Sequence, residues 1–75
     1  MNLLIANEAA LELEQHIHDR VGKRVRNLRV VRRGGKLVLE GSSHSFYAKQ
    51  LATHAVIEFG AIDELVNQIV VDRRE

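Results

Sequence analysis

The sequence contains no cysteine and no proline among its 75 residues. Without cysteine, neither a disulfide framework nor a cysteine-based zinc site can support the core of so small a domain. Without proline or a low-complexity stretch, nothing interrupts the chain, which predicts a single domain over residues 1–75 with a core of about residues 7–72. A domain of this size buries only about 60% of the surface that its unfolded chain exposes, so self-association would help to stabilise it.

Long hydrophobic runs are also missing. The first six residues are mostly apolar, but no basic segment precedes them, and acidic residues follow at Glu8, Glu12 and Glu14. This pattern predicts neither a signal peptide nor a membrane span. We therefore expect a cytoplasmic protein.

Two segments have the apolar spacing of amphipathic helices, and each ends at a glycine. The first is predicted over about residues 8–21, before Gly22, and the second over about residues 44–59, before Gly60, with Ser43 as its N-cap. The apolar positions are Ala10, Leu13, Ile17 and Val21 in the first helix, and Ala48, Leu51, Ala52, Ala55, Val56 and Phe59 in the second.

Three segments alternate in polarity as strands do. Residues 28–33 and 36–40 flank Gly34-Gly35, and two glycines supply the positive φ angles that a two-residue hairpin turn requires. Residues 65–71 are rich in β-branched side chains and predict a third strand. The predicted order of elements is αββαβ.

This order and several short motifs resemble the BON domain, a family found in bacterial osmotically inducible and other envelope-associated proteins. The similar motifs are the second strand from Gly35 to Gly41, the alanine-rich helix around Ala52 to Val56, and the closing segment from Val66 to Val71 with Asn67. The resemblance implies an α+β two-layer sandwich, in which two helices cover one face of a three-stranded mixed sheet. It also implies a non-catalytic role in binding phospholipid surfaces or partner proteins.

Eight of the eleven basic residues fall between Arg20 and Lys36, and no acidic residue lies among them. A cation close to an anionic membrane contributes about 1 kcal/mol of binding, so several together favour adsorption to acidic phosphates. We expect this basic hairpin to contact an anionic phospholipid surface or an acidic protein. The candidate anion-binding residues are Lys23, Arg24, Arg29, Arg32, Arg33 and Lys36.

Two other readings of the basic run stay open. Arginines on an edge strand also discourage edge-to-edge pairing, without any ligand. Nucleic acid is a less favoured partner, because base stacking needs aromatic residues among the cations, whereas Phe46, Tyr47 and Phe59 lie outside the basic run.

The alternation in the three strands separates a covered face from an open one. Residues expected in the core are Leu28, Val30, Leu37, Leu39, Ile69 and Val71. Residues expected on the open face are Arg29, Val31, Arg33, Lys36, Val38, Val66, Gln68 and Val70. The four valines among the latter are the candidate interface with a second copy or a partner protein, although β-branched residues are also simply good strand formers.

No set of side chains has the spacing of a catalytic or metal site. His16 and His18 point in different directions on a helix, and His44 lies ten residues from His54. The serines beside His44 have no acidic partner nearby in sequence. We therefore expect a binding module that is not an enzyme and uses no metal and no cofactor.

Overall fold

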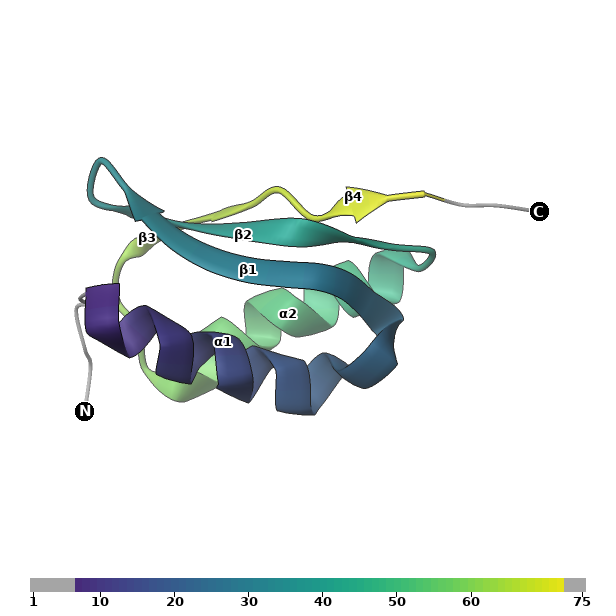
Figure 1. Ribbon diagram of the computed structural model, residues 1–75, viewed down its shortest axis with the longest axis horizontal. Helices are drawn as coiled ribbons and strands as arrows, with labels where there is room; N and C mark the ends of the chain where they lie inside the picture. The colour runs from purple at the N-terminus through teal and green to yellow at the C-terminus, as the bar shows by residue number, and fades with distance from the viewer. Residues whose placement is uncertain (1–6, 73–75) are drawn as a thin grey trace.

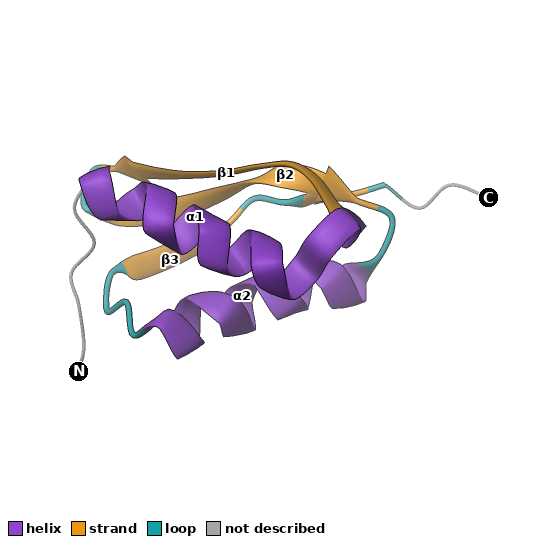
Figure 2. Ribbon diagram, turned by 60° about the horizontal axis from the view of Figure 1, so that its bottom comes forward, coloured by secondary structure: helices purple, strands orange, loops and turns teal. Residues whose placement is uncertain are grey.

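The computed structural model describes residues 7–72, with the backbone alone at positions 7 and 8. The elements in order are α1 (Asn7–Val21), the 3-10 helix η1 (Gly22–Arg24), β1 (Val25–Arg33), β2 (Lys36–Ser43), α2 (Phe46–Phe59), β3 (Glu64–Asn67) and β4 (Val70–Val71). Both helices lie beneath one face of the sheet, and no other described element covers the opposite face (Figures 1 and 2). The predicted α+β two-layer fold is confirmed, with four strands rather than three.

The central strand is β2, which is paired on both sides. It is antiparallel to β1, with Arg33 opposite Lys36 next to the turn. On its other side it is parallel first to β3 and then to β4. The two glycines of the turn have φ angles of 55° and 79°, as the predicted hairpin requires.

The predicted third strand is divided after Asn67, whose side chain explains the division. Its Oδ1 accepts a hydrogen bond from the Ile69 amide at 3.1 Å, within the segment between β3 and β4. Its Nδ2 donates to Lys49 O at 2.9 Å and to Thr53 Oγ1 at 2.8 Å, both on α2. Asn67 therefore fastens the break in the strand to the helix below it.

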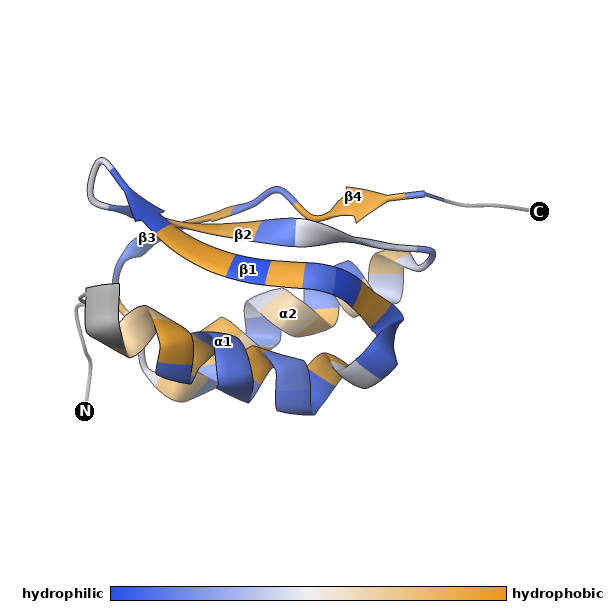
Figure 3. Ribbon diagram, in the orientation of Figure 1, coloured by the Kyte–Doolittle hydropathy of each residue, from blue (hydrophilic) through white to orange (hydrophobic). Residues whose placement is uncertain are grey.

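The core lies between the helices and the sheet, and the predicted stripes form it. Figure 3 shows apolar and polar bands along β1. The adjacent pairs Val30-Val31 and Arg32-Arg33 place one valine and one arginine on each face of this strand. Leu28 and Val71, both expected in the core, are only partly buried. Leu28 lies on the edge strand β1, where it lines a pocket, and Val71 is the last residue of β4. The buried apolar residues on the helix side are Ala10, Leu13, Ile17, Val21, Val25, Val30, Leu37, Leu39, Ala48, Ala52, Ala55, Val56 and Ile69.

The N-terminus of α2 corrects one prediction. The helix begins at Phe46, and its N-cap is Ser45, whose Oγ accepts a hydrogen bond from the Ala48 amide at 3.2 Å. Ser43 is instead buried at the end of β2, where its Oγ accepts a hydrogen bond from the Ser45 amide at 3.1 Å. The prediction of Ser43 as the cap was wrong because β2 continues further than the polarity pattern indicated.

A β-bulge lengthens β1 beyond its predicted start. Asn27 and Leu28 together face Gly41, so the register against β2 shifts by one residue. Asn27 has a φ of 58°, a conformation that asparagine tolerates better than most residues. Gly41 has a φ of 151°, and a Cβ atom there would lie 2.9 Å from the carbonyl oxygen of Arg26. The bulge therefore requires glycine at position 41.

Gly41→Ala is expected to destabilise the fold, because it adds a clash with backbone to a strained φ angle. The expected loss in the free energy of unfolding is about 2 kcal/mol or more. Urea denaturation followed by circular dichroism measures it. The matched control is Gly34→Asn, because Gly34 has a φ of 55° and open space around it, and Asn-Gly is the favoured pair for this turn. Equal stability of the Gly41→Ala variant and the parent would contradict this role of Gly41.

Candidate functional site

The basic run does not form a single patch. Because β1 spans most of the length of the domain, it separates η1 at one end from the Gly34-Gly35 turn at the other (Figure 1). At about 3.3 Å per residue, a strand of this length holds its ends more than about 25 Å apart. Of the six candidate anion-binding residues, Lys23 and Arg24 lie at the η1 end, and Arg32, Arg33 and Lys36 lie at the turn. Arg29 lies between the two groups, on the open face.

The cations near the turn have carboxylates beside them. Arg33 Nη2 lies 3.4 Å from Glu40 Oε2, and Lys36 Nζ lies 3.7 Å from Glu64 Oε2. All four of these side chains belong to the open face. The residues expected on this face from the sequence did not include Glu40 and Glu64. The basic character expected of the hairpin is therefore largely neutralised.

Arg32 belongs to the other face of the sheet. It has the same strand parity as Val30 and points toward the helix layer, where its Nε lies 3.6 Å from Oδ2 of the buried side chain of Asp63. The structure therefore does not bring Arg32 together with the cations of the open face. The sequence did not predict this pairing because Asp63 lies in the loop before β3, about thirty positions further along the chain.

Three cations at the η1 end have no carboxylate partner, whereas Arg20, just before η1, lies 2.6 Å from Glu58 Oε2. Lys23, Arg24 and Arg26 are all exposed, and none is in an ion pair within the described part of the chain. Arg24 Nη1 donates to Val21 O at 3.4 Å. Arg26 Nη2 donates to Nε2 of His44 at 3.1 Å, while Nδ1 of His44 donates to Asp72 O at 2.7 Å. Hydrogen bonds to neutral acceptors leave the positive charge of these side chains uncompensated.

Two exposed aromatic side chains lie at the same end of the domain. Phe46 is 53% exposed and Tyr47 is 64% exposed, in the first turn of α2. Strand pairing brings this turn close to η1, because Val25 is opposite Ser43 and Arg26 is opposite Ser42. We call the exposed set Lys23, Arg24, Arg26, Phe46 and Tyr47 the η1 patch.

Sequence reasoning missed the η1 patch because its members are about twenty positions apart. In the sequence, Phe46 and Tyr47 lie outside the basic run, although the fold places them at the same end of the domain as Lys23, Arg24 and Arg26. The signal that could have revealed the patch was the hairpin itself, since extending the pairing from the Gly34-Gly35 turn places residues 25 and 26 near residues 42 and 43.

The open face of the sheet carries a row of three valines. Val38 on β2 lies opposite Val31 on β1 and Val66 on β3, so these members of the candidate interface are adjacent. Val38 is only 6% exposed, because neighbouring side chains already cover it. Val70 is 60% exposed, but it lies beside Ser42 and is separated from the row. The structure therefore brings together three of the four predicted interface valines.

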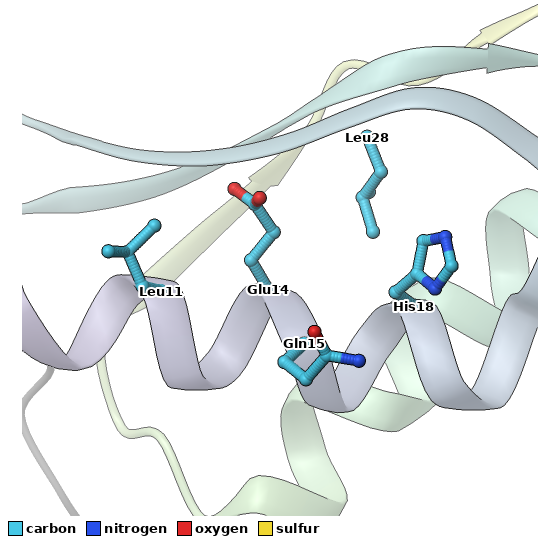
Figure 4. A pocket seen from close by; sticks show the side chains of 5 residues that line it. All are labelled: Leu11, Glu14, Gln15, His18 and Leu28. Carbon is cyan, nitrogen blue, oxygen red and sulfur yellow. The ribbon is translucent and has the colours of Figure 1, made fainter.

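A cavity of about 370 Å³ lies between α1 and β1 (Figure 4). Its lining residues are Leu11, Glu14, Gln15, His18 and Leu28. Glu14 rises from the helix toward the strand, and its Oε1 accepts a hydrogen bond from the Val30 amide at 3.0 Å. Since β1 is an edge strand of the sheet, this carboxylate occupies an outward backbone donor that another strand would otherwise use.

His16 has contacts that are structural. His16 lies 3.6 Å from Glu58 and packs against the ring of Phe59, with ring centres 5.5 Å apart.

In residues 7–72, no group of three or more histidine, aspartate or glutamate side chains is placed to hold a metal ion. Neither α1 nor α2 is long and apolar enough to cross a membrane.

Comparison with known proteins found no matching family model, no similar curated protein and no similar solved structure. Gly41 and Asn67, the residues on which the resemblance to BON domains most depends, both have structural contacts here: one permits the bulge, and the other ties β3 to α2. The resemblance therefore rests on residues of the fold rather than on residues of a binding surface.

Glu14→Ala is expected to lower the free energy of unfolding by about 1 to 2 kcal/mol, because it leaves the Val30 amide without its acceptor. Glu14→Gln keeps an acceptor oxygen and should recover most of this loss. Glu12→Ala, at an exposed position of the same helix, is the control for general effects on α1. Urea denaturation of the three variants measures the differences, and equal stability of Glu14→Ala and Glu12→Ala would contradict the role of Glu14.

Proposed function

We propose that this chain is a non-catalytic, cytoplasmic binding module that contacts anionic phospholipid surfaces through its η1 patch. The observation that carries the proposal is the combination, at one end of the domain, of three exposed cations without carboxylate partners and two exposed aromatic rings. This function is also what the resemblance to BON domains implies.

The physical chemistry of a membrane surface suits both parts of the patch. Lysine and arginine near anionic headgroups contribute about 1 kcal/mol each, so three cations give about 3 kcal/mol, which is roughly a hundredfold in partitioning. Aromatic side chains favour the boundary between headgroups and acyl chains, where Phe46 and Tyr47 would lie. The attraction is screened by salt, so binding should be reversible.

The hairpin contributes less to this proposal than the sequence suggested. Arg33 and Lys36 would have to exchange their contacts with Glu40 and Glu64 for contacts with lipid. Their net gain is therefore smaller than that of cations without a carboxylate beside them.

Co-sedimentation with phosphatidylcholine vesicles, with and without phosphatidylserine, tests the proposal. The chain is expected to bind only the anionic vesicles and to be released at high salt. Arg24→Glu combined with Arg26→Glu should lower partitioning by more than about tenfold, because two attractive charges become repulsive. Phe46→Ser combined with Tyr47→Ser should weaken binding while leaving its dependence on salt unchanged.

The matched control is Arg29→Glu combined with Arg33→Glu. It changes the net charge by the same amount as the Arg24→Glu and Arg26→Glu pair, but on β1 away from η1. This variant should keep most of its binding, and circular dichroism should confirm that every variant is folded. Equal losses in the two charge reversals would contradict a specific role of the η1 patch. Binding of an oligothymidylate without any binding of vesicles would show that the same cations and rings serve single-stranded nucleic acid instead.

A further inference from the structure

The open face of the sheet carries an ordered pattern of charge that the η1 patch does not use. On this face, β2 presents Lys36, Val38 and Glu40 in succession, because alternate residues of a strand point the same way. The valine row therefore lies between a cation and an anion on the central strand. Val31 and Val66 extend the row across both neighbouring strands and are each partly exposed.

This pattern is complementary to itself when one copy is reversed. Consider a twofold axis that passes above Val38, parallel to the sheet and perpendicular to β2. Rotation about this axis places the open face of a second copy against the open face of the first, with its β2 running in the opposite direction. Each Lys36 then lies opposite Glu40 of the second copy, and the two valine rows meet at the axis. Such an interface satisfies the rule for twofold dimers, in which residue i contacts residue j and residue j contacts residue i.

We propose that a second copy of this chain packs face to face on the open sheet around this axis. Face-to-face sheets lie about 10 Å apart, a distance that lysine and glutamate side chains can bridge from opposite sides. The same axis places Arg33 on β1 opposite Arg29 of the second copy. These arginines lie at the rim of the interface, where their long side chains reach water and the repulsion between them is screened. The occupant is a second copy, because β2 of a reversed copy presents Glu40 to Lys36, Val38 to Val38 and Lys36 to Glu40.

The dimer also fits the size of the domain. A chain of 75 residues has a small core. Val38 is already covered within the monomer, so the burial that a dimer adds comes from the partly exposed Val31 and Val66. This inference goes beyond the proposed lipid binding and does not depend on it, because the η1 patch lies at one end of the domain and the twofold axis lies over Val38, nearer the other end of β2.

Sedimentation equilibrium of two single variants and of their mixture tests the proposal without any lipid. The unmodified chain should form dimers within the micromolar to millimolar range. On the open face of β2, Lys36→Glu leaves two acidic side chains and no basic one, and Glu40→Lys leaves two basic side chains and no acidic one. Each variant alone should therefore dimerise at least about tenfold more weakly. An equimolar mixture should recover dimers, because an acidic face then meets a basic one.

The mixture keeps the test valid even if a single substitution weakens the fold, since a misfolded variant cannot restore association. Glu64→Gln is the control: it removes the carboxylate beside Lys36 within the chain but leaves the proposed pair intact, so dimerisation should persist. The proposal is overturned if the unmodified chain stays monomeric at millimolar concentration. It is also overturned if the single variants dimerise like the parent or if their mixture does not recover dimers.

Discussion

The pairing of β2 with strands on both of its sides is the constraint on which the rest of the structure depends. This strand is antiparallel to β1 and parallel to β3 and β4, so an error in its register would displace every other strand. The bulge opposite Gly41 sets that register toward the η1 end. Asn67 sets the position of α2 relative to the parallel side.

The same pairing determines how charge is distributed over the surface. Because β1 is extended along β2, the basic run is spread over the length of the domain instead of gathering around a loop. Its members near the turn lie next to carboxylates of β2, β3 and the loop before β3. Its members near η1 lie at the end of the domain where α2 begins with two exposed aromatic residues. One run of cations in the sequence therefore becomes two regions with different chemistry.

Periodicity predicted the elements that local rules govern. The glycine pair fixed the hairpin, the glycines after the helices marked their ends, and apolar spacing identified buried residues such as Ile17, Leu37 and Ile69. The open position of Arg29, Val31 and Arg33 also followed from alternation alone. These features depend on neighbours in the sequence, so the sequence contains their signal.

The features that could not be predicted depend on contacts between distant segments. The bulge needs Asn27 in a positive φ conformation opposite Gly41, which no polarity pattern indicates. The pairing of Arg32 with Asp63 and the hydrogen bond between Arg26 and His44 require the assembled sheet. The candidate site belongs to this second group, which explains why the sequence did not predict how the cations are grouped.

The most direct test of the account is residue-resolved NMR of the chain with nanodiscs that contain phosphatidylserine. The account predicts that amide signals of residues 22–26 and 46–47 broaden or shift first, while those of residues 32–36 near the turn change little. Perturbation concentrated at residues 32–36, with the η1 patch unaffected, would contradict it.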